Sequence, residues 1–159
     1  MPHLRLQVPE EWLREDFKLA TGFDPRKLLD HLVQVVAGLR MEKPTADGAV
    51  PETVPIINLS NLKHAIVPLQ HAHVAGDSSK RFLHVTLAAG NDTPGRTDAV
   101  RRRVAETLGN EIDQFVSAFP SVHASLASVT AHVQDIDRAR GYSTTAERKK
   151  KREEAKAAT

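Results

Sequence analysis

Apolar and polar residues alternate in three segments of the chain, and each alternation predicts a β-strand with one buried face. The segments are residues 3–8, 82–89 and 129–137. Successive side chains of a strand point to opposite sides, so every second residue shares a face. The apolar members are Leu4, Leu6 and Val8 in the first segment, Leu83, Val85 and Leu87 in the second, and Val129, Ala131 and Val133 in the third. A further strand is expected within residues 56–75, where Pro68 requires a bulge or an edge position.

Two other segments repeat apolar residues at three- and four-residue steps, which is typical of an amphipathic α-helix. Asp24 and Pro25 predict an N-cap followed by proline at the first helical position, and the apolar positions continue to about Leu39. A longer helix is predicted from about Thr97 and ends before Pro120. Both helices would follow a strand and precede another.

The remaining segments predict shorter structure. A short helix is expected over residues 10–20. Residues 41–55 are expected to form a loop, because this segment contains three prolines and an Asp-Gly pair. Residues 90–95 have the composition of a turn.

The order of these elements is β-α-β followed by β-α-β. The sequence therefore predicts an α+β fold with duplicated β-α-β units, in which a four-stranded sheet carries two helices on one face. The second face of such a sheet stays exposed unless another subunit covers it, so oligomerisation is expected on burial grounds alone. We assign residues 1–143 to this domain and residues 144–159 to a basic tail that is disordered or a frayed helix.

Composition narrows the class of protein. The chain has 159 residues, which suits one domain with a sizeable core. It has no cysteine, so disulfides and thiolate chemistry are excluded. No apolar run approaches the roughly 18 residues that span a membrane. The N-terminal residues lack the layout of a signal peptide, and a cytoplasmic protein without a membrane partner is expected.

The basic character of the chain lies in its tail. The sequence pI is about 9.0, but residues 147–159 hold an excess of Lys and Arg, and the rest of the chain is slightly acidic. Nucleic-acid binding is therefore not expected from the folded body. A polybasic tail of this kind binds phosphates weakly, which leaves a nucleic-acid-associated protein as one alternative.

Two sets of residues are candidates for chemistry. Arg96 lies at the start of the long helix, where a guanidinium and free backbone N–H groups together suit an anion. The histidines, among them His64, His71, His73 and His84, suggest a metal site, but no acidic or sulfur ligand has matching spacing, so no metal is expected. No phosphate-binding glycine loop or Ser-His-Asp signature is present.

Several motifs resemble the 5-carboxymethyl-2-hydroxymuconate Δ-isomerase family of the tautomerase superfamily. They are Met1-Pro2-His3-Leu4, Phe82-Leu83-His84-Val85-Thr86-Leu87 followed by Gly90, Gly95-Arg96, Arg101, Glu106, Leu108, and Val133-Gln134-Asp135-Ile136-Asp137 with Tyr142. The likeness covers about residues 1–8, 25–40 and 62–143. It implies a duplicated β-α-β fold, a homotrimer, and an isomerase that needs no cofactor or metal. Family members isomerise unsaturated 2-hydroxy or 2-oxo di- and tricarboxylic acids in the degradation of aromatic compounds.

The resemblance also implies roles for three residues. Pro2 becomes the general base when Met1 is removed, because a free α-amino group has a pKa of about 7.7–8.0, which nearby cations or burial lower. The neutral amine then moves a proton on a carbon acid. Arg96 corresponds to the family's carboxylate-binding arginine. A second family arginine aligns with Lys63, which keeps the charge but lacks the planar fork.

The residues also leave plainer interpretations open. Arg101, Arg102 and Arg103 are expected on the exposed side of the helix. Arg40 is expected at the C-terminus of the preceding helix, where a cation interacts favourably with the helix dipole. His3 and His84 match strand positions of the family and are expected to form hydrogen bonds. The Lys63 departure and the long loops leave a second alternative, a binding or structural member of the same fold without catalysis.

Overall fold

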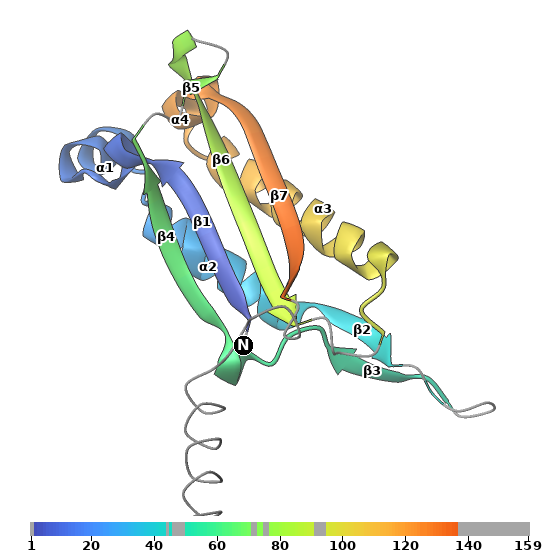
Figure 1. The fold of residues 1–159 in the computed structure, drawn as a ribbon. Helices are drawn as coiled ribbons and strands as arrows, with labels where there is room; N and C mark the ends of the chain where they lie inside the picture. Colours follow the sequence, from blue (N-terminus) through green and yellow to red (C-terminus); the bar gives the residue numbers. More distant parts are fainter. Residues whose placement is uncertain are drawn as a thin grey trace, which may run out of the picture.

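Four long strands form one mixed sheet in the order β4-β1-β6-β7 (Figure 1). We describe the fold from a computed structural model, which covers residues 2–43, 45, 50–70, 73–74, 77–90 and 95–136. The strands are β1 (His3–Pro9), β4 (Lys63–Leu69), β6 (Asp77–Gly90) and β7 (Leu126–Ile136). The pairs β1–β4 and β6–β7 are parallel, whereas β1 and β6 are antiparallel at the centre. A short strand, β5 (His73–Val74), also pairs with β6.

Each parallel pair is joined through one long helix, as the sequence predicts. α2 (Pro25–Gly38) connects β1 to β4, and α3 (Asp98–Ser117) connects β6 to β7 through α4 (Pro120–Ser125). The Asp24 side chain accepts a hydrogen bond from the Arg26 backbone N–H at 2.9 Å, which confirms the predicted N-cap. Figure 1 shows α2 and α3 on the same side of the sheet. The duplicated β-α-β fold is therefore confirmed.

The core lies between the sheet and these two helices. It contains the buried side chains of β1 and β6 and the apolar stripes of both helices. The fully buried ones include Leu4, Leu6, Val8, Leu28, Leu32, Leu83, Val85, Leu108 and Ile112. No polar or charged residue in the described part of the chain is buried. The alternation read from the sequence therefore assigns the faces of β1 and β6 correctly.

No helix of the described residues lies over the opposite side of the sheet, and we call this side the open face. Strand registers place its side chains in rows that run across the four strands. The open face consists of Lys63, Ala65 and Val67 of β4, His3, Arg5 and Gln7 of β1, His84, Thr86 and Ala88 of β6, and Thr130, His132 and Gln134 of β7. Of the side chains named in these rows, only Arg5 and Lys63 carry a permanent charge, and none is a carboxylate.

An additional helical segment covers one end of the core. The expected helix over residues 10–20 is instead a 3₁₀ turn, η1 (Glu10–Leu13), followed by α1 (Glu15–Thr21). The buried Phe23 ring lies edge-on against Trp12 at 5.4 Å and against Phe119 at 5.3 Å between ring centroids. Phe17 stacks on Trp12, and Phe115 also contacts Phe23. This aromatic cluster attaches the segment to the C-terminal end of α3.

The loop expected over residues 41–55 is wrong in part, because two strands form there. β2 (Arg40–Lys43) and β3 (Glu52–Pro55) pair as an antiparallel hairpin, which projects sideways from the body in Figure 1. The base of the hairpin is held by a backbone hydrogen bond from Ile56 to Leu39 at 3.1 Å. A short 3₁₀ turn, η2 (Leu59–Asn61), then leads into β4.

Two expectations about proline and arginine are confirmed. Pro68 lies in β4, which pairs on one side only and is an edge strand. The Arg40 side chain donates to the carbonyl of Ala37 at 2.7 Å at the C-terminal end of α2. The predicted turn at 90–95 lies mostly outside the described residues, and so does the whole basic tail. No described helix has the length and hydropathy needed to cross a membrane.

Candidate functional site

The N-terminal proline lies at one end of the sheet, at the start of the central strand β1 (Figure 1). The Pro2 carbonyl accepts a hydrogen bond from the Lys63 backbone N–H at 3.1 Å, which extends the ladder between β1 and β4 by one residue. Pro2 is half-buried. The C-terminal ends of β6 and β7 lie at the same end of the sheet, because Ala88 pairs with His3 and Gln134 pairs with Ala88.

Cationic side chains surround this start of the chain on the open face. Lys63 is the register partner of His3, and Arg5 lies two residues further along the same face. Burial lowers the pKa of His3 below its ordinary value of 6.5, and the charges of Arg5, the chain terminus and Lys63 lower it further. A protonated imidazole is therefore disfavoured there. The same charges favour an anion and disfavour a further cation.

Arg96 lies at the same end of the sheet but on its other side. Its guanidinium donates to the carbonyl of Gly90, the last residue of β6, and to the carbonyl of Ile56 at 2.9 Å. The side chain is half-buried. Arg96 therefore ties the segment after β3 to the end of β6, directly before the cap of α3 at Thr97.

A narrow apolar cleft surrounds the Arg96 side chain. Its walls are Ile56, Ile57, Leu87, Ala89, Val100, Val104 and Val133, and Arg101 closes one side. Arg101 is half-buried and forms an ion pair with Asp98. The expectation that Arg101 decorates the exposed side of the helix is thus wrong, whereas Arg102 and Arg103 are exposed. In the sequence, Arg101 directly follows Val100 and lies three residues before Val104. This spacing places Arg101 at the edge of the apolar stripe and could have indicated its partial burial.

A wider groove of about 550 Å³ adjoins this cleft at Val100. It runs between the β2–β3 hairpin and the first turn of α3. Its lining includes Glu42, Lys43, Pro51, Thr97 and Arg103. The groove is open to solvent and mixes both signs of charge. The sequence did not indicate it, because the hairpin that forms one wall was expected to be a loop.

The three site residues predicted from the sequence therefore share one end of the sheet but not one face. Pro2 and Lys63 are adjacent through the β1–β4 ladder. Lys63 lies on the open face, whereas Arg96 lies among side chains of the covered face, such as Leu87 and Ala89. Within one chain, a single ligand contacts both Lys63 and Arg96 only if it extends around the end of the sheet from one face to the other.

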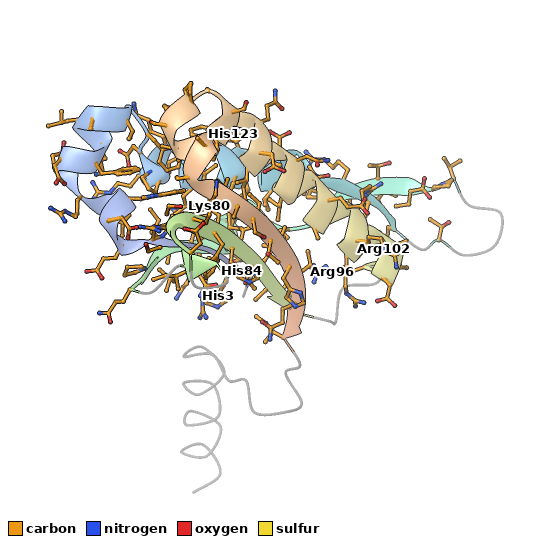
Figure 2. All side chains as sticks on the ribbon, turned by 90° about the horizontal axis from the view of Figure 1, so that it is seen from above. His3, Lys80, His84, Arg96, Arg102 and His123 are labelled. Atoms are coloured by element: carbon orange, nitrogen blue, oxygen red, sulfur yellow. The ribbon has the colours of Figure 1, made fainter. Side chains whose placement is uncertain are left out.

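The open face also holds a pair of histidines away from this rim. His84 of β6 is the register partner of Thr130, and His132 of the adjacent β7 is the partner of Thr86. The Thr86 hydroxyl and the His84 Nε2 lie 3.0 Å apart, which fits the expectation that His84 forms a hydrogen bond. Burial lowers the pKa of His84, and the neighbouring His132 lowers it further. Figure 2 shows His3 and His84 on the sheet and His123 on α4, at the opposite side of the molecule.

Metal ligands do not gather in the described part of the chain. No three side chains of His, Cys, Asp or Glu lie together there. His71 and the side chain of His73 fall outside the described residues, so the metal interpretation based on them is not tested by the structure.

Comparison with known proteins identifies the fold. As a sequence, the chain matches no protein-family profile and no curated protein. As a structure, it superimposes on a 5-carboxymethyl-2-hydroxymuconate delta-isomerase with a TM-score of 0.60, over 91% of this chain and 87% of the isomerase, at 17% identity. This is the tautomerase fold. A second protein of this fold, Pt0534 inactivated by 2-oxo-3-pentynoate, superimposes with a TM-score of 0.51 over 90% of this chain and 93% of Pt0534, at 14% identity.

These comparisons confirm the resemblance read from the sequence at the level of architecture. At 17% and 14% identity the shared property is the fold. The chain is thus consistent with a divergent tautomerase-like protein, whose chemistry depends on its own residues.

Proposed function

We propose that the protein is a cofactor-independent isomerase of the tautomerase type. In this proposal, it moves a proton on a carboxylated, unsaturated 2-hydroxy or 2-oxo acid. Pro2 is the general base, and Arg96 and Lys63 bind the carboxylates. The proposal extends to a homotrimer, a cytoplasmic location and a role in the breakdown of aromatic compounds, as the resemblance implies. It involves no cofactor and no metal.

The observation that carries the proposal is the position of Pro2 in a tautomerase fold. After loss of Met1, its ring nitrogen is a free secondary amine at the start of the central strand, half-buried and beside Lys63. Cations around an amine favour its neutral form, and a neutral amine is a base. The ring holds the nitrogen close to the strand, so little conformational freedom is lost when a substrate binds.

The two proposed carboxylate ligands act differently. Lys63 is exposed at the start of β4 and offers a mobile point charge. Arg96 already donates to two backbone carbonyls. A bidentate grip on a carboxylate therefore competes with these carbonyls, and binding would loosen the segment around Ile56. The proposed reaction therefore needs this rearrangement, or else an assembly in which Lys63 of one subunit lies near Arg96 of another.

The assembly part of the proposal rests on the open face. Helices cover only one side of the sheet, and the other side carries small or uncharged side chains at most positions. Interface cores are depleted in charged residues in this way. Two further copies of the chain around a threefold axis would cover all three open faces and bring the end of one sheet near the rim of the next.

The activity is tested with phenylenolpyruvate or a hydroxymuconate, by following the ultraviolet absorbance of the dienol. Intact mass first establishes that Met1 is absent. We expect Pro2→Ala, which keeps a free amine after Met1 removal, to lower kcat/KM at least about 100-fold. Lys63→Arg restores the planar fork and is expected to lower KM for a dicarboxylate relative to Lys63→Met. Full activity of Pro2→Ala would show that the ring is dispensable, and full activity after acetylation of the N-terminal amine would overturn the role of Pro2.

A covalent probe tests the amine without knowledge of the substrate. 2-Oxo-3-pentynoate, the compound that inactivates Pt0534, has an electrophilic triple bond that accepts a nucleophilic amine. Addition forms one C–N bond, and the amine proton moves to the alkyne carbon without a leaving group. We expect one adduct per chain on the N-terminal peptide, with loss of activity. An adduct distributed over lysines, at the same rate in protein whose N-terminal amine is acetylated, would contradict the proposal.

One observation favours a second candidate, a non-catalytic member of the fold. The guanidinium of Arg96 holds backbone carbonyls on two segments, which is a structural task. For a non-catalytic member, Arg96→Lys alters stability, and the wild type itself shows no turnover of the test substrates. The third alternative, nucleic-acid association through the basic tail, is tested by truncation after residue 146 with polyanion binding as the readout.

A further inference from the structure

The open face has an unusual charge composition for a solvent-exposed surface. Its fixed charges, Arg5 and Lys63, lie near the Pro2 end of the sheet. The remaining ionisable side chains of the face are histidines. Exposed surfaces of soluble domains normally mix acidic and basic residues. Among the described side chains in these rows no carboxylate accompanies the cations, so the charge of this part of the face depends on whether its imidazoles carry a proton.

The histidine pair lies near the middle of this face, in two adjacent rows. His84 has Gln7 of β1 on one side and Thr130 of β7 on the other. His132 has Thr86 beside it, and Arg5 is the next side chain across the sheet in that row. The described groups next to the pair are therefore neutral amides and hydroxyls and the ring of Phe82, which precedes His84 on the same face of β6, together with the fixed positive charge of Arg5.

When one imidazole of the pair is protonated, it places a second positive charge beside the other. The charge of a protonated His132 lowers the pKa of His84 and so disfavours its protonation. Lys63 adds positive potential from the Pro2 end of the face. In the rows that the structure describes, no negative side chain offsets a proton that is taken up.

We infer that the homotrimer turns its open faces toward its axis and stays assembled only while His84 and His132 are uncharged, so that mild acid dissociates it into folded monomers. The inference rests on the homotrimer of the proposed function. Around a threefold axis, each open face meets copies of itself, so the facing groups are again neutral side chains, Arg5, Lys63 and histidines. Protonation would then place like charges together in an enclosed space.

The direction of the pH effect follows from proton binding. A histidine that is neutral in the trimer and protonated in the free monomer binds more protons after dissociation. In the folded monomer the pKa of His84 is itself lowered below 6.5, so the trimer is stable at neutral pH and weakens only as the pH falls through this lowered pKa. Each histidine that takes up a proton raises the dissociation constant by up to about tenfold per pH unit.

Sedimentation velocity of the full-length protein between pH 8 and pH 5 tests the inference, at fixed protein concentration and ionic strength. We expect a trimer at pH 8 and a folded monomer near pH 5.5, with unchanged far-ultraviolet circular dichroism. His84→Gln with His132→Gln removes both imidazoles, and glutamine keeps a polar group near Thr86. This variant is expected to lower the midpoint by at least about half a pH unit. His132→Gln alone, at an exposed position, is expected to give part of the shift.

His123→Gln is the matched control, because His123 is exposed on α4, away from the open face (Figure 2). It should leave the midpoint unchanged. A wild-type trimer that persists at pH 5, or that tightens in acid, would overturn the inference and leave the homotrimer intact. An equal midpoint in the double variant would also overturn it. A monomer at pH 8 would instead refute the proposed trimer itself.

Discussion

Replacing Arg96 by methionine separates its structural role from its proposed role in binding. Methionine keeps an unbranched apolar stem in the cleft beside Ile56 and Val100, but it removes the guanidinium. The carbonyls of Ile56 and Gly90 then lose their charged donor. Ile56 itself is only 4% exposed, so water replaces the donor poorly at that end.

The expected loss of stability follows from these two contacts. Hydrogen bonds to charged groups contribute about 1.5–3 kcal/mol each, and partial exposure of Arg96 places the total toward the lower part of the range. We expect the free energy of unfolding to fall by about 2–4 kcal/mol in Arg96→Met. Arg96→Lys, with one point donor, is expected to lose about half of this. Urea denaturation at a single protein concentration measures both values.

Arg102→Met is the matched control, since Arg102 is exposed on the same helix. Its effect should stay within about 0.5 kcal/mol. If Arg96→Met unfolds at the same urea concentration as the wild type, the two carbonyl contacts contribute nothing, and our account of the hairpin base is wrong. If Arg96→Lys keeps most of the stability but raises KM at least about tenfold, the guanidinium also binds the carboxylate.

Two further predictions concern elements that support the site. Phe23→Ala removes the central ring of the aromatic cluster, which is fully buried, and should lower the free energy of unfolding by about 4 kcal/mol, with a smaller loss in Phe23→Leu. An equal stability of Phe23→Ala and wild type in urea would show that the cluster does not anchor α1. Asp24→Ala removes the N-cap of α2 and should cost about 1 kcal/mol, whereas Asp24→Asn should retain most of the stability. Thermal unfolding of the two variants compares them, and equal losses would point to charge and not to capping.

Much of the fold could be predicted from local patterns. The alternation around Leu4 and Leu83 identifies the two central strands and their buried faces, because a residue's face in a strand depends only on its position in the sequence. Asp24 and Pro25 mark the start of α2 for a similar reason, since capping is a contact between near neighbours. The open face follows at once from the number of helices and the side on which they pack.

The β2–β3 hairpin could not be predicted from the same signals. Each of its strands is four residues long, and of their side chains only Met41 is buried, so no alternation is visible. The hairpin is held at its base by contacts with distant parts of the chain. Ile56 is fixed by Leu39 and by Arg96, and the Arg103 side chain donates to the Arg40 carbonyl. Such long-range contacts leave no trace in local periodicity.

The direction of the Arg96 side chain could not be predicted either, because it also depends on a contact with a distant part of the chain. The sequence places Arg96 at a helix start, where a cation lies either in solvent or beside an anion. Its partner is the carbonyl of Ile56, which lies 40 positions away in the chain. The position of Lys63 beside Pro2, by contrast, follows from the parallel β1–β4 register, which the structure shows; the family resemblance singles out Lys63 only through its alignment with a family arginine.

The two halves of the duplicated fold explain why each chain should hold one site and not two. The antiparallel pairing of β1 and β6 puts the start of β6 at the opposite end of the sheet from Pro2. The corresponding position in the second half lies within a continuous chain, where every backbone nitrogen is an amide and has no basicity. That end is instead occupied by Arg81, which forms an ion pair with Glu11 and donates to the carbonyl of Ser78. Duplication of the fold therefore duplicates the scaffold, whereas the base of the proposed function requires a free terminal amine, which an internal position cannot supply.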